Sequence, residues 1–121
     1  MSRGARSLVV WTGYVGVLGM VLLLVPNWFL SIFRIEETDE VWIRILGVLL
    51  VTLGVYYWTA ARAELGPLMT ASAWARWGIV IALVVLAVTV GPWQLVLFAS
   101  VDLLGGLWTY LAVRADRAAA R

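Results

Sequence analysis

The chain has 121 residues, of which 64% are hydrophobic and 13% charged, with a formal net charge of +2. A soluble domain carries about 25% charged residues, and a chain this short has too much surface to hide so many apolar side chains in one core. Cysteine and histidine are absent, which excludes disulfides, thiolate metal sites and the commonest acid–base catalyst. We therefore expect a single membrane domain over residues 1–121, with the lipid bilayer as its solvent and no nucleic-acid partner.

Four apolar stretches follow one another along the chain. They cover residues 8–25, 41–61, 74–90 and 93–113. Each is close to the 17–25 residues that cross about 30 Å of hydrocarbon as a helix. Gly91 and Pro92 separate the last two, and such a dipeptide breaks a helix sharply. The sequence predicts an all-α membrane protein, folded as a bundle of four transmembrane helices.

Two connecting segments have features of their own. Residues 26–35 are apolar, begin with Pro26 and are too short to span the bilayer. We expect them to form a short interfacial helix after the first span, at the outer surface of the membrane. Residues 66–73 include Pro67, a residue typical of helix starts, and we expect them at the inner surface.

The arginines are divided unequally between the two sides of the membrane. If four helices cross, both tails and the loop between the second and third spans share one side. The basic residues expected there are Arg3, Arg6, Arg62, Arg76, Arg114, Arg117 and Arg121. The opposite side holds Arg34 and Arg44 with four acidic residues. Basic residues favour the cytoplasmic side, so we expect both termini in the cytoplasm and the chain in the inner cell membrane.

Small residues indicate how the spans pack, because helices in lipid associate through close contact at small side chains. Three of the spans hold several glycines each, namely Gly13, Gly16 and Gly19, then Gly47 and Gly54, then Gly105 and Gly106. The third span holds only Gly78, near one end. We expect the third span to be the most lipid-exposed, or to face another subunit.

Asp102 is an acidic residue within the fourth span. It lies nine residues past Trp93, which is about 13–14 Å along a helix and close to the bilayer centre. An acid at that depth costs roughly 2.5–3.5 kcal/mol on insertion scales. Its helical neighbours Ala99, Gly105 and Gly106 form a small face, so we expect Asp102 to point into the bundle or toward a partner.

Two roles for Asp102 follow from this position. It is either a buried structural acid that fixes helix register, or a proton or cation site. Tyr14 and Thr52 are predicted near the same depth and are candidates to hydrogen-bond the carboxyl group.

Arg44 is a second ionisable residue, about one turn inside the second span. Thr38 or Asp39 is expected to cap that helix. Glu40 precedes Arg44 by four residues, the favoured order for a helical ion pair, so we expect a structural Glu40–Arg44 pair. A direct Arg44–Asp102 pair is the alternative. The predicted depths differ by about 10 Å, so that pair would need extended side chains or a bridging water.

Two stretches resemble a known family. They are residues 38–62, TDEVWIRILGVLLVTLGVYYWTAAR, and residues 101–112, VDLLGGLWTYLA. They are similar to the small four-span bacterial membrane proteins called BphX-like. Typical of that family are the acid, tryptophan and arginine that open the second helix, the tyrosine pair near its end, and the aspartate in the fourth helix. The likeness covers most of the chain from Pro26 onward. It implies a four-span topology and a bacterial membrane, and it carries over no activity and no catalytic residue.

No phosphate-binding loop, dinucleotide-binding glycine pattern, metallohydrolase motif or serine-hydrolase motif is present. We therefore expect a protein that is not an enzyme, without catalytic, cofactor-binding or metal-binding residues. We expect it to act by association, as a homo-oligomer or as an accessory subunit of a membrane complex. The alternative is a small proton- or cation-coupled transporter or channel that uses Asp102.

Overall fold

The computed structural model describes residues 1–120, and over these residues it contains helices and loops but no strand. The five helices are α1 (Arg3–Leu24), α2 (Pro26–Ile32), α3 (Trp42–Arg62), α4 (Gly66–Thr89) and α5 (Leu95–Ala119). All except α2 are long and apolar enough to cross a membrane. The predicted all-α fold with four membrane-spanning helices is thus confirmed, and the protein is a multi-pass membrane protein.

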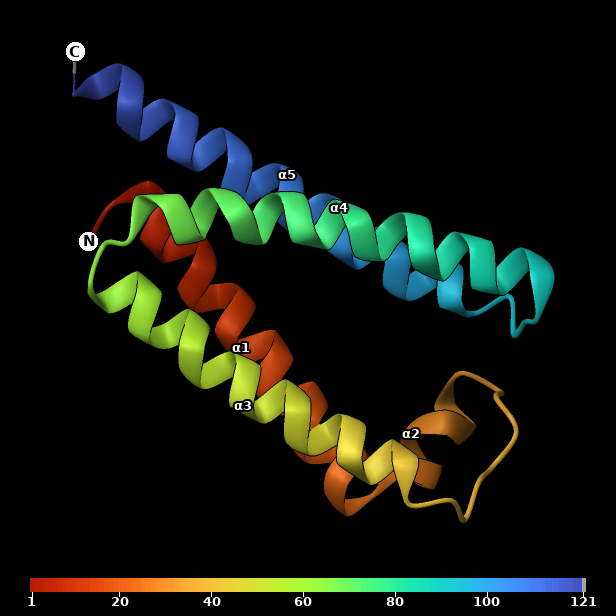
Figure 1. Ribbon diagram of the computed structural model, residues 1–121. Coiled ribbons are helices and arrows are strands. Elements are labelled where there is room, and N and C mark those ends of the chain that lie inside the picture. Colours follow the sequence, from red (N-terminus) through yellow and green to blue (C-terminus); the bar gives the residue numbers. More distant parts are fainter. Residues whose placement is uncertain (121) are drawn as a thin grey trace.

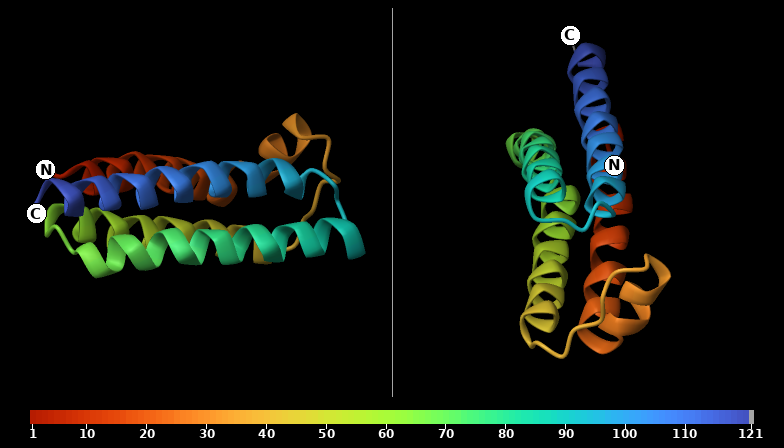
Figure 2. Two further views of the ribbon diagram at one scale, coloured as in Figure 1. Left: turned by 90° about the horizontal axis from the view of Figure 1, so that it is seen from above. Right: turned by 90° about the vertical axis from the view of Figure 1, so that its right-hand side faces the viewer.

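The four long helices form two antiparallel pairs. Helix α1 packs along α3, and α4 packs along α5. The two pairs lie close together near the chain termini and diverge toward the end that carries α2 (Figure 1). Viewed from above, the start of α1 and the C-terminal end of α5 lie at the same end of the molecule (Figure 2, left). Each pair is a hairpin of consecutive spans.

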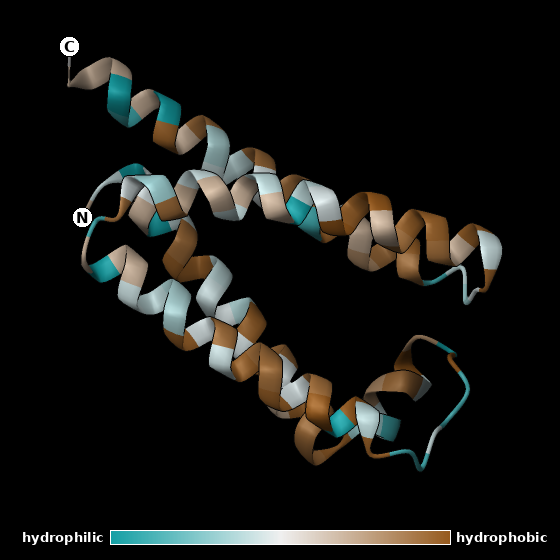
Figure 3. Cartoon of the chain, in the orientation of Figure 1, coloured by the Kyte–Doolittle hydropathy of each residue, from teal (hydrophilic) through white to brown (hydrophobic). Residues whose placement is uncertain are grey.

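Hydropathy along the helices agrees with this arrangement. Hydrophobic residues dominate long stretches of all four spans, whereas hydrophilic residues gather near the chain ends and in the loop between α2 and α3 (Figure 3). Apolar side chains remain exposed along the outside of the spans, including Val17, Ile81 and Val88. In a membrane protein these surfaces contact lipid, which is as apolar as the side chains themselves.

The α1–α3 pair is held by close backbone contact at glycines. A Cβ on Gly19 would lie 2.7 Å from the carbonyl oxygen of Gly47, and a Cβ on Gly47 would lie 2.6 Å from the carbonyl oxygen of Gly19. Gly54 faces Gly16 more loosely, with 3.8 Å between its would-be Cβ and the Gly16 nitrogen. The predicted role in helix packing is therefore confirmed for Gly19 and Gly47, but it is wrong for Gly13, whose would-be Cβ meets nothing within 4 Å.

The N-terminus of α1 is tied to two other segments. The backbone N–H groups of Arg3 and Gly4 donate to the carboxylate of Asp116, at 3.2 and 2.8 Å. The backbone N–H of Ser2 donates to the carboxylate of Glu64, in the loop between α3 and α4, at 2.8 Å. Acids suit a helix N-terminus, because its free N–H groups carry partial positive charge. These contacts hold the two helix pairs together at the end near the termini.

Helix α2 confirms the short helix predicted after the first span, since it begins at Pro26 and ends at Ile32. The aromatic ring of Phe98 on α5 packs against Phe29 of α2 and against Phe33, which follows α2. The ring centroids are 5.7 Å apart for Phe29 and 4.9 Å apart for Phe33. The buried amide of Gln94 also donates to the Arg34 carbonyl at 3.4 Å. The segment following the first span thus bridges the two pairs where they diverge.

Helix α4 begins eight residues earlier than the predicted third span. Residues 66–73 were expected as a separate surface segment, but they form the first two turns of α4. Its most apolar window is the least buried of the four, at 17%. This span is therefore the least covered by the rest of the chain, as expected for a span that faces lipid or another subunit.

Candidate functional site

The most deeply buried charged side chain is Arg76 of α4. It is 1% exposed, although it lies in a helix that crosses the membrane. The sequence-based interpretation placed Arg76 in a cytoplasmic loop, and this is wrong because α4 begins at Gly66. An arginine within a span is costly and is normally turned toward the protein interior. Arg76 follows that rule.

Residues of its own helix and of two neighbouring helices hold the Arg76 guanidinium. Its Nη2 donates to the hydroxyl of Thr109 on α5 at 2.8 Å and to the hydroxyl of Ser72 at 3.1 Å. Its Nε donates to the Ser72 carbonyl at 3.2 Å. The guanidinium also lies over the ring of Trp11 on α1, with Cζ 4.5 Å from the ring centroid. Cation–π contact of this kind is strongest where water is excluded.

The hydroxyl pair beneath this contact extends the network to α1. Ser7 and Thr109, both fully buried, are hydrogen-bonded to each other at 3.0 Å. Ser7 also donates to the Gly4 carbonyl at 2.7 Å. Arg76 therefore links the two helix pairs through polar contacts in a region where few other polar groups are available.

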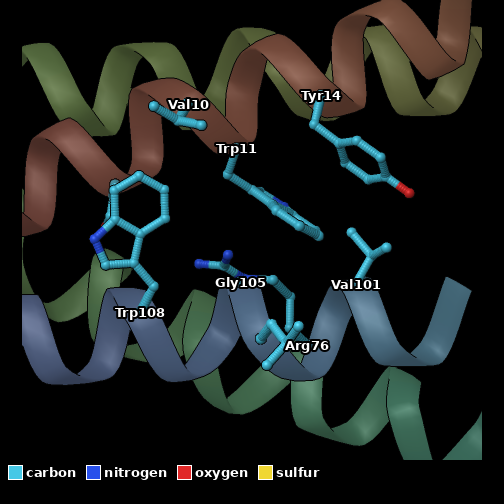
Figure 4. Close-up of a pocket in the computed structure, with 9 residues that line it drawn as sticks. Val10, Trp11, Tyr14, Arg76, Val101, Gly105 and Trp108 are labelled. Carbon is cyan, nitrogen blue, oxygen red and sulfur yellow. The ribbon is translucent and has the colours of Figure 1, made fainter.

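Gly105 of α5 makes room for the arginine and the tryptophan. A Cβ at this position would lie 2.7 Å from the Trp11 ring and 3.3 Å from Nη1 of Arg76. Figure 4 shows the guanidinium between the Trp11 ring and the α5 backbone at Gly105. Any larger residue at position 105 would displace one of the two groups.

One nitrogen of Arg76 lacks a partner. Within residues 1–120, Nη1 is buried and makes no hydrogen bond. Arg76 is one of the residues that line a groove of about 310 Å³ between α1 and α5 (Figure 4). The walls of the groove are Ser7, Val10, Trp11, Tyr14, Val101, Leu104, Gly105 and Trp108. The groove therefore combines an apolar wall with one cationic residue in its lining.

Asp102 is half-buried on α5, one turn before Gly105 and Gly106. Arg76 is the cation whose electrostatic field reaches its carboxyl group. Within the described part of the chain, however, Asp102 forms neither an ion pair nor a side-chain hydrogen bond. Tyr14 lies near enough to interact electrostatically with Asp102, but no hydrogen bond joins the two.

The other predicted site residues lie elsewhere. Thr52 is exposed on α3 and donates to the Val48 carbonyl of its own helix, so it does not contact Asp102. Arg44 is exposed and donates through Nη1 to the Leu23 carbonyl at the end of α1. The structure does not bring Arg44 and Asp102 together.

Glu40 and Arg44, both within the part of the chain that the structure describes, do not form the predicted ion pair. Helix α3 begins at Trp42 and its N-cap is Val41, so Glu40 precedes the helix and the expected four-residue helical spacing does not apply. The cap predicted from Thr38 or Asp39 is wrong for the same reason. The Thr38 hydroxyl accepts instead from the Glu40 backbone N–H at 3.1 Å.

The buried guanidinium gives this region a fixed positive charge with hydrogen-bond donors. A guanidinium stays protonated, so it acts as a donor and a positive charge and not as an acid or base. Within residues 1–120, no cluster of His, Cys, Asp and Glu is suited to a metal ion.

Comparison of the chain with protein-family models, with curated proteins and with solved structures gives no match. The resemblance to the BphX-like proteins therefore stays a prediction, and function has to be argued from the geometry alone.

Proposed function

We propose that this protein acts by association within the membrane, through one face of α4, as a homo-oligomer or as an accessory subunit of a membrane complex. The face consists of Ala71, Ala75, Gly78 and Ala82, all of them exposed. At 100° per residue these four positions fall within an arc of about 60°. They form a continuous stripe of small residues, called here the α4 stripe.

The position of the α4 stripe supports the proposal. The buried residues of α4 are Met69, Ser72, Ala73 and Arg76, which lie on a different side of the helix. A Cβ on Gly78 would meet no atom within 4 Å, whereas Cβ atoms on Gly19, Gly47 and Gly105 would all lie under 3.0 Å from a neighbour. Small stripes in membrane helices allow a second backbone to approach closely. The close-packed glycines of the other spans serve contacts within the chain, and the α4 stripe is left for another helix.

A matched pair of glycine substitutions tests the proposal. Gly13 of α1 is also exposed, and its would-be Cβ also meets nothing within 4 Å. Native mass in mild detergent should show an assembly heavier than the 13.4 kDa chain. Gly78→Ile should reduce it to the single chain, and Gly13→Ile should not.

The form of association is decided by the same measurement. A multiple of the chain mass would identify a homo-oligomer, and a heavier partner that is lost with Gly78→Ile would identify an accessory role. Native mass of a single chain, with no cross-linking between copies or to another protein in native membranes, would overturn the proposal.

We further propose that both termini face the cytoplasm of a bacterial cell. Arg76 is buried and no longer counts toward this orientation, but Arg3, Arg6, Arg62, Arg114 and Arg117 still share the end near the termini. The excess of basic residues on one side supports the orientation. Because the chain has no cysteine, a single cysteine placed at either terminus can be tested with a membrane-impermeant maleimide. Labelling from outside intact cells would contradict this orientation.

A proton- or cation-coupled transporter using Asp102 is the second candidate. It is favoured by one observation, namely that this half-buried carboxyl group has no hydrogen bond among residues 1–120. Asp102→Asn removes the charge and keeps the shape of the side chain. If the variant folds and proton flux into reconstituted vesicles matches the wild type, this second candidate fails.

A further inference from the structure

We propose that the groove between α1 and α5 binds an amphiphile with a carboxylate headgroup and a single acyl chain, whose carboxylate accepts from Nη1 of Arg76. This inference goes beyond association through the α4 stripe, because it concerns a different surface. It rests on the partnerless nitrogen of Arg76, a residue that lines the groove, and on the apolar side chains that make up the rest of the lining.

The donor on Arg76 points to an anion. Arg76 is 1% exposed, and its Nη1 has no hydrogen-bond acceptor among residues 1–120. A buried charged donor without an acceptor is strongly destabilising, so such groups are normally paired. Its other nitrogens are engaged by Ser72 and Thr109. The guanidinium is thus held by these contacts, and Nη1 remains the nitrogen without an acceptor.

The groove wall points to an acyl chain. Val10, Val101, Leu104 and Trp108 are all exposed at its mouth, on the surface where the spans contact lipid. An anion in aqueous solution would have to pass this apolar wall without its hydration shell. An anion carried on a hydrocarbon chain can enter from the bilayer instead, with its chain along the wall.

The number of available donors favours a carboxylate over a phosphate. Arg76 offers one nitrogen with two N–H groups. A carboxylate brings two oxygens and one charge to this nitrogen, whereas a phosphate monoester brings three terminal oxygens and more than one charge. At about 310 Å³ the groove is at the small end of ligand sites, which suits a headgroup with the beginning of one chain.

The fold holds the donor in place before a ligand arrives. Gly105 leaves the space in which Nη1 and the Trp11 ring lie together, and the ring covers the guanidinium from the α1 side. Ser72 and Thr109 hold the guanidinium in place, so a carboxylate needs only a shift of the covering Trp11 ring to reach the buried Nη1. Preorganisation of this kind lowers the entropic cost of binding.

Native mass spectrometry in a nonionic detergent tests the proposal with three probes. Oleate carries the carboxylate, methyl oleate has the same chain without charge, and oleoyl lysophosphatidate carries a phosphate. We expect one oleate per chain, bound at least about tenfold more tightly than methyl oleate, since a hydrogen bond to a charged group is worth about that factor. Equal binding of oleate and methyl oleate, or tighter binding of lysophosphatidate than of oleate, would overturn the proposal.

Variants locate the bound oleate. Arg76→Gln should weaken oleate at least about tenfold and leave methyl oleate unchanged. Because Arg76 is part of the core, its substitution also affects folding, so a second pair of variants tests the site without changing Arg76. Leu104 lines the groove, whereas its neighbour Leu103 is equally apolar, exposed and outside the groove.

Leu104→Trp should therefore block oleate, and Leu103→Trp should bind it as the wild type does. Both variants should keep the wild-type oligomeric state, which separates this inference from association through the α4 stripe. Wild-type binding of oleate by Leu104→Trp would show that the groove is not the site.

Discussion

Gly19 of α1 and Gly47 of α3 each occupy the place where the other would need room for a side chain. A Cβ on either glycine would come within 2.7 Å of the carbonyl oxygen of the other. Because both obstacles are backbone atoms, neither can turn aside. The two helices can therefore approach this closely only while both positions remain glycine.

Gly19→Ala should separate α1 from α3 and destabilise the protein by about 1–3 kcal/mol, the usual cost of overpacking. Unfolding in SDS mixed micelles, followed by far-UV circular dichroism, measures the change. Gly13→Ala, in open space on the same helix, is the control and should be neutral or slightly stabilising, since alanine favours a helix by about 1 kcal/mol over glycine. Equal unfolding midpoints for the two variants would contradict this explanation.

Thr109→Val should destabilise the protein by about 1–3 kcal/mol, because it removes the acceptor of a buried charged donor at nearly constant shape. The Thr109 hydroxyl accepts from Arg76 at 2.8 Å and is also bonded to Ser7. The same unfolding assay applies. Thr52→Val is the matched control, since the Thr52 hydroxyl is exposed and bonds only its own helix. A loss as large for Thr52 as for Thr109 would show that the buried network contributes nothing specific.

The contact between Glu64 and Ser2 should make stability depend on pH. Hydrogen bonds from Ser2 lower the pKa of the Glu64 carboxyl below its ordinary value of 4.5. A group whose pKa is lower in the folded state stabilises it fully above the unfolded pKa, and that contribution is lost as pH falls through the folded pKa. The stabilisation should therefore be present above about pH 4.5 and disappear below it.

Thermal unfolding of wild type and Glu64→Gln across this range measures the effect. The wild type should unfold at the higher temperature near pH 7, and the gap should close in acid. Glu36→Gln, in the loop between α2 and α3, serves as the control. A gap that stays constant from pH 7 to pH 3 would contradict a role for the Glu64 carboxylate.

Phe98→Ala should loosen the link between α2 and α5. The substitution removes ring contacts with Phe29 and Phe33, each worth about 0.5–1.5 kcal/mol. Hydrogen exchange should rise in α2 and in the first turns of α5, while the end of the molecule near the termini stays protected. Leu97 directly precedes Phe98 and is exposed. Leu97→Ala is therefore the control and should leave hydrogen exchange in α2 unchanged.

The number and nature of the helices were predictable from the sequence, but the site was not. Long apolar stretches identify the spans because lipid demands them. The third span was predicted to begin at Trp74, only two residues before Arg76, so Arg76 fell at its edge and was counted with the preceding loop. One signal was available. Pro67 is a helix-start residue, and from there Met69, Ser72, Ala73 and Arg76 share one face at helical spacing.

The predicted Glu40–Arg44 pair failed for a related reason. Its spacing has meaning only if both residues lie in the helix, and the boundary falls between them at Trp42. The unsatisfied nitrogen of Arg76 depends on how three helices meet. No pattern within a single helix contains that information.

The division into two helical hairpins has a consequence for how the chain enters the membrane during synthesis. Helices α1 and α3 emerge first and can dock before α4 is made, because their close contact needs no later residue. The second hairpin then brings Arg76, whose insertion as an isolated helix would cost roughly 2.5–3.5 kcal/mol. On arrival it finds Trp11 and Ser7 already positioned. The first hairpin, α1 with α3, thus provides partners for the charged side chain that the second hairpin, α4 with α5, brings into the membrane.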